Sequence, residues 1–442
     1  MQGHAMLQRL RSLLRGGVEL DLLIGLVLKG MGALASFGLN LLIARVLGAD
    51  GIGVFQIALA TAALLSVLSV LGLDTVIVRT VSVAWRRQDF AVVRASIVKV
   101  LKIVAGWGAI VALVVGALSV PFAETVLGHA GVGRSLLLMI AAVPALALIR
   151  AISASIRATG RVLLSQSLDG VSYTGLTAVA LGAMLLARGG IGFNAPAATY
   201  LAASWLVLAV SLACVAALIR KLPHGTADIS LRSGGRISLI YLLGFLVEWS
   251  AVVMLAASAG AAEAGIYRVA AQFGLLFLLV RNAFDQMVGA HLAARFAEQD
   301  YAGMRAMARR TGLIGAVLSA PVALLIIIAP SFLLGLFGPE FKQGALALMI
   351  LGAGQFASVA IGPLGTILDM SHREDLGMKI EFAVAATALV LLFVLTPQFG
   401  LTGTAAAVTC SIFLRIACLK VVSDRLLARF EQAAAQAELP DA

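Results

Sequence analysis

The sequence has little charge, few aromatic residues and almost no cysteine. Only 12% of its 442 residues are Asp, Glu, Lys or Arg, 6% are aromatic, and three are Cys. About a quarter of the residues of an ordinary soluble domain are charged, so the composition excludes that class. Cys214, Cys410 and Cys418 lie inside apolar runs without metal-ligand spacing, and they indicate neither a disulfide framework nor a metal site.

The sequence also lacks the motifs of common enzymes. GxxxxGK[ST], HExxH, CxxC and GxSxG are all absent, and the five histidines are scattered. We therefore expect no catalytic residue, no nucleotide site, no cofactor and no metal, and we look for function in transport instead of covalent chemistry.

Long apolar runs are what the sequence has in abundance. Hydrophobic residues make up 61% of the chain, and the mean hydropathy is +1.02. About 20 apolar residues span a bilayer as a helix, and runs of this length without two-residue alternation favour helices over a barrel. We predict an all-α integral membrane protein with about twelve transmembrane helices. Their approximate ranges are 20–46, 51–78, 97–122, 136–156, 163–187, 197–219, 237–259, 265–291, 312–337, 345–370, 376–396 and 401–422.

The formal charge of +11 follows the predicted topology. Most Lys and Arg residues lie at alternate ends of the predicted helices, and the other ends carry few. The positive-inside rule then places both termini and the basic loops in the cytoplasm, as an even number of helices requires. This distribution argues against nucleic acid as a partner.

Two stretches indicate an internal repeat. LLIARVLGADGIGVF at 41–55 is a glycine-rich hairpin tip, and its relative LAASAGAAEAGIY returns at 255–267. A shift of 212 residues aligns them without a gap. Six helices separate the copies, which predicts parallel repeats and two six-helix bundles, with domains at 1–222 and 223–442 and a polar link at 220–236.

Six charged residues lie well inside predicted helices, where an unpaired charge costs at least about 3 kcal/mol on insertion scales. Four are cations and two are anions, so a cavity lined by them would attract anions. We predict that the cations bind the cargo and that the anions are candidates for ion coupling. The cations are Lys29, Arg150, Arg281 and Arg415, and the anions are Glu248 and Asp285.

Five of these six residues have a structural alternative. Lys29 and Arg415 can extend their side chains towards the membrane surface. Arg281 and Asp285 are four residues apart and can neutralise each other on one helix face. Glu248 lies near the middle of its helix, where it either couples transport to an ion gradient or neutralises a neighbouring cation such as Lys29 or Arg281.

Several phrases in order along the chain carry a family resemblance: ARVLGADGIGVFQIALA, LGLDTVIVR, LFGPEF, ILGAGQFASVAIGPLGTILDMSHRE and PQFGLTGTAAAVT. Together they resemble the polysaccharide exporters of the multidrug/oligosaccharidyl-lipid/polysaccharide (MOP) flippase superfamily. The resemblance implies a MATE-like pair of six-helix lobes and export of undecaprenyl-pyrophosphate-linked sugar units across a bacterial inner membrane. It implies membrane lipid and lipid-linked oligosaccharide as partners, with a polysaccharide polymerase and other export proteins as further candidates.

Two other functions stay open. An ion-coupled multidrug antiporter of the same superfamily would be expected to use an acidic cavity, whereas the acids counted above are outnumbered. A membrane glycan polymerase or ligase would be expected to display a sizeable outer loop, and the predicted outer connections are short. A peptidoglycan-precursor flippase of this superfamily typically has two helices more than the twelve predicted here, which argues against that function.

Overall fold

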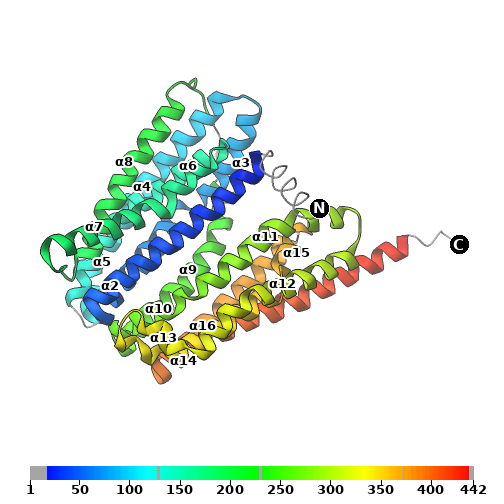
Figure 1. The fold of residues 1–442 in the computed structure, drawn as a ribbon. Helices are drawn as coiled ribbons and strands as arrows, with labels where there is room; N and C mark the ends of the chain where they lie inside the picture. The colour runs from blue at the N-terminus through cyan, green and yellow to red at the C-terminus, as the bar shows by residue number, and fades with distance from the viewer. Residues whose placement is uncertain (1–16, 127–129, 228–230, 372, 438–442) are drawn as a thin grey trace, which may run out of the picture. The chain divides into compact units, whose positions relative to one another are not determined.

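The computed structural model describes residues 17–126, 130–227, 231–371 and 373–437, and it contains no strand in these ranges. The chain folds as a series of long helices joined by short turns (Figure 1). The elements are α2 (Gly17–Val70), α3 (Leu73–Arg86), α4 (Phe90–Val126), α5 (Ala130–Ala158), α6 (Val162–Gln166), the π-helical turn η1 (Ser167–Val171), α7 (Ser172–Arg188), α8 (Ala195–Ile219), α9 (Leu231–Ala259), α10 (Ala261–Gln272), α11 (Gly274–Ala297), α12 (Tyr301–Ile328), α13 (Pro330–Gly335), the 3-10 turn η2 (Pro339–Gly344), α14 (Ala345–Ala360), α15 (Leu364–Met370) and α16 (Glu374–Ala437).

Ten helical stretches of the described chain are long and apolar enough to cross a membrane. Two of them, in α2 and α16, are long enough to cross it twice. As single straight helices, the 54 residues of α2 and the 64 of α16 would measure roughly 80 and 95 Å, far more than a bilayer. Each is interrupted by one glycine with non-helical angles, Gly48 (φ 69°) in α2 and Gly400 (φ 53°) in α16. Division at these glycines gives the twelve predicted crossings, and the all-helical, multi-pass membrane fold is confirmed.

The chain divides into two compact units. Unit 1 comprises Met1–Leu47 and Ala58–Leu242, and unit 2 comprises Gly48–Ile57 and Leu243–Ala442. The hairpin tip Gly48–Ile57 therefore belongs to the unit formed by the second half of the chain. The predicted domains at 1–222 and 223–442 stay a prediction of the repeat.

Helix α5 is the central element of unit 1 and packs against α3, α4 and α8 (Figure 1). It is lined by small and branched residues, so the neighbouring helices approach closely. Ile149 and Ile152 of α5 are fully buried with Ile77 of α3 and Ile97 of α4. This core fixes the position of Arg150, which follows Ile149 directly on α5.

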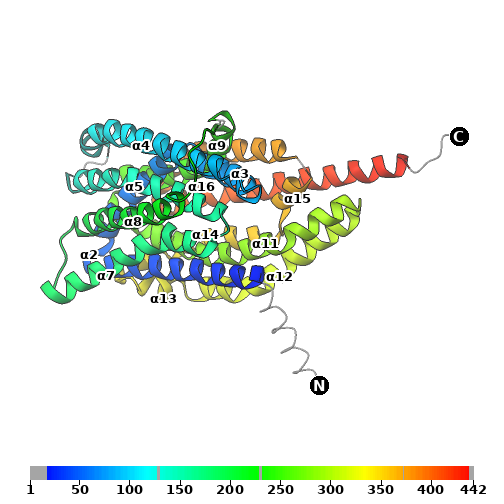
Figure 2. The same ribbon diagram turned by 90° about the horizontal axis from the view of Figure 1, so that it is seen from above.

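Helix α14 has the corresponding role in unit 2, where it packs against α12 and α16. Beyond the apolar crossing, α16 continues as a single helix past the other elements of this unit (Figure 2). Phe430 on this extension stacks on Tyr301 and meets the edge of Phe296, so the extension packs against the turn between α11 and α12.

Two segments of unit 2 that the repeat relates lie in direct contact. A Cβ at Gly265 in α10 would lie 2.8 Å from the backbone nitrogen of Gly53, and a Cβ at Gly53 would overlap the carbonyl oxygen of Ala261. One turn further along each segment, Arg268 donates a hydrogen bond from Nε to Oε1 of Gln56 at 3.3 Å, again across 212 residues. The repeat is thus visible as a contact between equivalent positions of its two copies.

Five predicted helices are interrupted. The 312–337 helix breaks at Ala329, between α12 and α13, and the 265–291 helix is divided at Phe273 into α10 and α11. The 51–78 helix turns at Leu71 and Gly72 between α2 and α3, and the 163–187 helix has non-helical angles at Asp169 and Gly170. The 345–370 helix breaks after Ile361, because the next residues are a glycine at φ +83° and a proline. Such interruptions occur in membrane proteins where they are buried in protein or line a polar cavity.

Candidate functional site

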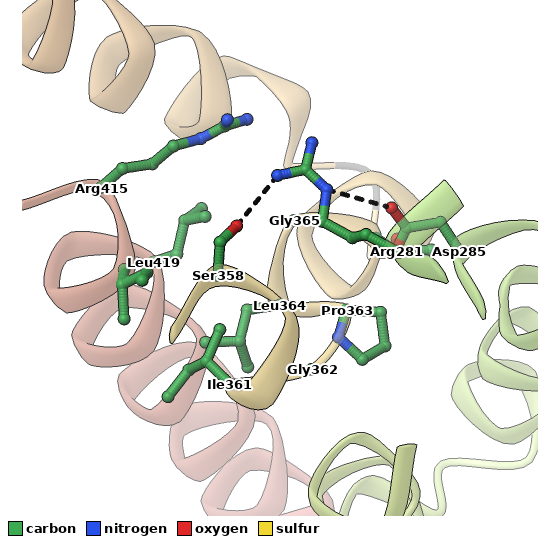
Figure 3. A pocket seen from close by; sticks show the side chains of 12 residues that line it. Arg281, Asp285, Ser358, Ile361, Gly362, Pro363, Leu364, Gly365, Arg415 and Leu419 are labelled. Atoms are coloured by element: carbon green, nitrogen blue, oxygen red, sulfur yellow. Dashed lines mark hydrogen bonds and ion pairs between the residues drawn. The ribbon is translucent and has the colours of Figure 1, made fainter. Parts of the chain in front are cut away.

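Three of the six predicted site residues, Arg281, Asp285 and Arg415, lie together in one cleft of unit 2 (Figure 3). The cleft is partly open to its surroundings, and the roughly 450 Å³ of space between its walls includes part of that open region. Ser358 from α14 and Thr366 from α15 complete its polar lining. The remaining walls are apolar side chains and the glycines of the helix break.

The break between α14 and α15 forms one wall of this cleft. Pro363 has no backbone N–H and Gly362 has φ +83°, so the helix cannot continue through them. The break is held by close packing on α12: a Cβ at Gly312 would overlap the carbonyl oxygen of Ala360, and a Cβ at Gly362 would overlap that of Ala308. The wall is therefore fixed by backbone-to-backbone contact.

Arg281 extends across the cleft from α11 between a neutral and an acidic partner (Figure 3). Its Nη1 donates a hydrogen bond to Oγ of Ser358 at 3.0 Å. Its Nε lies 4.0 Å from Oδ2 of Asp285, one turn along the same helix. Thr366 donates a hydrogen bond from Oγ1 to Oδ1 of Asp285 at 3.2 Å. The predicted self-neutralising pair is present, but its closest atoms stand beyond hydrogen-bond distance.

Arg415 enters the same cleft from α16 and is held more tightly. Its Nη2 lies 2.6 Å from Oε1 of Glu381, which is on the earlier crossing of α16. The Nε of Arg415 is buried without a hydrogen-bond partner among the described residues. Arg415, which the sequence predicts to be a cavity cation with surface anchoring as the alternative, thus lines the cleft and is paired with Glu381.

Arg150 lies in unit 1, and its partner is Asp74 at the start of α3. Nε of Arg150 donates a hydrogen bond to Oδ2 of Asp74 at 2.9 Å, and the two side chains are 30% and 12% exposed. Asp169, at the kink before α7, also interacts electrostatically with Arg150 and Arg157. Arg150 therefore belongs to a charged cluster of unit 1.

The two remaining predicted residues, Lys29 and Glu248, lie on α2 and α9. Lys29 lies in α2, and its side chain is outside the described residues. Glu248 of α9 is 67% exposed, and its Oε2 lies 3.9 Å from Nη1 of Arg268. The sequence analysis named Lys29 or Arg281 as the cation that Glu248 neutralises; the structure pairs it with Arg268.

Sequence reasoning missed four charged residues of these clusters: Asp74, Asp169, Glu381 and Arg268. The repeat offered a signal for the acids, because Asp169 and Glu381 are 212 residues apart and Asp74 and Asp285 are 211 apart. With these residues included, Arg150, Arg281 and Arg415 each have an acidic partner. The count of four cations to two anions was therefore incomplete.

No group of three His, Cys, Asp or Glu side chains that could hold a metal ion occurs within the described ranges. The three cysteines are free thiols, as their spacing indicates. The chemistry available in the unit 2 cleft is hydrogen bonding and ion pairing by two guanidinium groups, two hydroxyl groups and the carboxylate of Asp285.

Comparison with known proteins places these features in a wider group. A family model described as polysaccharide biosynthesis protein matches residues 21–288. A search of curated protein sequences finds no match.

Several solved structures share the fold. One is a multidrug resistance MATE family transporter of the MOP superfamily in an inward-facing conformation, with a TM-score of 0.73 and 12% identity, covering 91% of this chain and 96% of that one. Another is the lipid II flippase MurJ in an inward closed conformation, with a TM-score of 0.67 and 12% identity over 95% and 94%. A third is a MOP superfamily transporter from Pyrococcus furiosus, described by the reverse polarity of its binding pocket. Its TM-score is 0.61 and its identity is 13%, and the match covers 93% of this chain and 95% of that one. At these identities the likeness is one of fold.

Proposed function

The chain belongs to the polysaccharide biosynthesis protein family, and we propose that it is a flippase that moves oligosaccharide units linked to undecaprenyl pyrophosphate across a bacterial inner membrane. It is a multi-pass membrane protein, and it shares its fold with a MATE transporter and with the flippase MurJ. The flipped units serve the synthesis of surface polysaccharide such as lipopolysaccharide or exopolysaccharide. No covalent step is part of this proposal.

The observation that carries the proposal is the pair of guanidinium groups in the unit 2 cleft. A pyrophosphate diester presents several anionic oxygens, and a guanidinium group can hold two of them through parallel hydrogen bonds. Arg281 offers its guanidinium group to the cleft while engaged by the neutral Ser358 and by a carboxylate 4.0 Å away. Arg415 adds a second positive charge to the same lining. Lys29 and Arg150 are proposed as further cargo contacts on the strength of their depth in the sequence pattern alone.

The remainder of the cargo fits the same scheme. The polyprenyl tail remains in the lipid, and the sugars occupy the aqueous path. Both termini and the basic loops face the cytoplasm, in accord with the distribution of Lys and Arg. A polysaccharide polymerase and other export proteins are the proposed partners that receive the flipped unit.

A complementation experiment tests this function. A strain that lacks the gene should accumulate lipid-linked glycan on the cytoplasmic face, and expression of the wild-type chain should remove it. Arg281→Ala should abolish export at a normal protein level in the membrane, whereas Arg281→Lys should retain part of it because the charge is kept. Arg429→Ala, an exposed residue on the extension of α16, is the matched control and should export normally. Normal export by Arg281→Ala, Arg150→Ala and Lys29→Ala alike would contradict an anion-binding cavity.

The second candidate is an ion-coupled multidrug antiporter. The acids of the charged clusters, Asp74, Asp169, Glu248 and Glu381, favour it because acidic side chains bind organic cations. Proteoliposome assays separate the two functions. A flippase should be inhibited by inorganic pyrophosphate and not by an organic cation dye, and an antiporter should respond the other way round.

A further inference from the structure

We infer that Asp285 is the resident counter-ion of the cargo site: it neutralises Arg281 in the empty cleft and gives the guanidinium group up to the anionic head of the cargo. This inference rests on the proposed function and deepens it. It assigns to one carboxylate the task of limiting affinity, so that a bound anion can leave again.

Distance separates Asp285 from the carboxylates that pair with Arg150 and Arg415. Arg150 and Asp74 lie 2.9 Å apart, and Arg415 and Glu381 lie 2.6 Å apart, both within hydrogen-bond distance. Arg281 and Asp285 are 4.0 Å apart although both are on α11 one turn from each other. The first two pairs make contact at hydrogen-bond distance, whereas Asp285 balances the charge of Arg281 without a direct hydrogen bond to it.

The direction of the Arg281 side chain explains this difference. Its Nη1 is committed to Ser358 across the cleft, a partner that places the guanidinium group but carries no charge (Figure 3). A guanidinium group has five N–H donors, and this contact uses one of them. Arg281 is therefore positioned by a neutral group and balanced by a separate acidic one.

Asp285 has a second hydrogen bond that does not depend on Arg281. Thr366 on α15 donates to its Oδ1 at 3.2 Å, while Oδ2 faces Arg281. When a phosphate group takes Arg281, Asp285 keeps this donor and its partial contact with solvent. Release of the arginine thus leaves neither group without a polar partner.

The charge balance of the cleft explains why Arg281 should exchange Asp285 for the anionic head of the cargo. Arg415 is matched by Glu381, and Arg281 by Asp285, so the charges of these two pairs balance in the absence of cargo. An arginine without a counter-ion would hold a pyrophosphate more strongly and release it more slowly. A site that must load on one side and unload on the other needs affinity that is sufficient for entry yet weak enough for exit.

The test compares Asp285→Asn with wild type in the purified full-length chain. Inorganic pyrophosphate is the binding probe, and flipping of a fluorescent polyprenyl pyrophosphate in proteoliposomes is the transport readout. Removal of the competing charge should tighten pyrophosphate binding about two- to fivefold, the scale of a partly exposed ion pair. The maximal flipping rate should fall while the concentration for half-maximal rate also falls, a split that a merely structural role would not produce.

Two further variants complete the design. Asp285→Glu should restore the wild-type affinity because it restores the charge. Asp375→Asn removes one carboxylate in the same unit, from the exposed pair with Arg373, and should leave affinity unchanged. Unchanged or weaker pyrophosphate binding by Asp285→Asn would overturn the counter-ion inference. If Arg281→Gln binds pyrophosphate as wild type does, or wild type itself fails to bind it, the proposed anion site fails, and the inference falls with it.

Discussion

Gly53 and Gly265 pack backbone against backbone, although 212 residues separate them and each belongs to a different copy of the internal repeat. Within unit 2, this contact joins the hairpin tip Gly48–Ile57 to the start of α10. The absence of side chains at both positions permits the contact.

Replacement of Gly265 by valine should therefore separate these segments. The new Cβ would overlap the carbonyl oxygen of Ala49, a backbone atom that cannot move aside alone. Overpacking of this kind costs about 1–3 kcal/mol. Thermal unfolding in detergent should show a lower midpoint for Gly265→Val than for Gly244→Val, since Gly244 on α9 has no atom within 4 Å of its Cβ position. Equal midpoints would mean that the contact is dispensable.

The Arg150 and Asp74 pair should contribute to the stability of unit 1. Asp74 is only 12% exposed, so Arg150→Gln leaves a largely buried carboxylate without its partner and should cost about 2 kcal/mol. Asp74→Asn should have a similar effect through Arg150. The double variant should lose less than the sum of the single ones in a double-mutant cycle of unfolding. Additive losses would argue that the two side chains act independently.

The helix break at Gly362 should tolerate no side chain. Alanine there would have to adopt φ +83°, and its Cβ would overlap the carbonyl oxygen of Ala308. The expected cost is about 1–3 kcal/mol, with displacement of α15 and of Thr366 from Asp285. Gly365→Ala is the control, because Gly365 lies three residues away with no neighbour within 4 Å of its Cβ position. Export assays and unfolding midpoints should both distinguish the two variants, and matching behaviour would be evidence against a rigid break.

Substitution of Glu248 should test whether transport is coupled to an ion gradient. The Glu248 carboxylate is 67% exposed and 3.9 Å from Arg268, so it is accessible and is not tied by a hydrogen bond to that arginine. In proteoliposomes with an imposed pH or sodium gradient, Glu248→Gln should lose the stimulation by the gradient and still bind pyrophosphate. Full gradient-driven flipping by this variant would leave Glu248 only its contact with Arg268.

The apolar runs were sufficient to predict the twelve crossings, because a bilayer imposes both the length and the apolar character of a helix. The reversal at Gly48 was also predictable from its glycine-rich tip. The break at Gly362 was not identified, although a Gly-Pro pair inside an apolar run indicates one. Its packing on Gly312 depends on tertiary structure, which no local pattern reveals.

The candidate site was predictable in its members but not in its pairing. Arg281, Asp285 and Arg415 stand out by depth in the sequence, and they share one cleft. Their partners do not stand out: Glu381 lies close to the end of a predicted helix, where charge is ordinary. Which acid meets which arginine depends on helix packing, as Glu248 and Arg268 demonstrate.

The ion pair of unit 1 also has a consequence for biosynthesis. Asp74 leaves the ribosome 76 residues before Arg150. At about 5–20 residues per second, the carboxylate waits roughly 4–15 s for the helix that carries its partner. Arg281 and Asp285, one turn apart on α11, emerge together and can enter the membrane as a neutral pair. A nascent chain that stalls between Asp74 and Arg150 therefore carries the Asp74 carboxylate without its arginine partner.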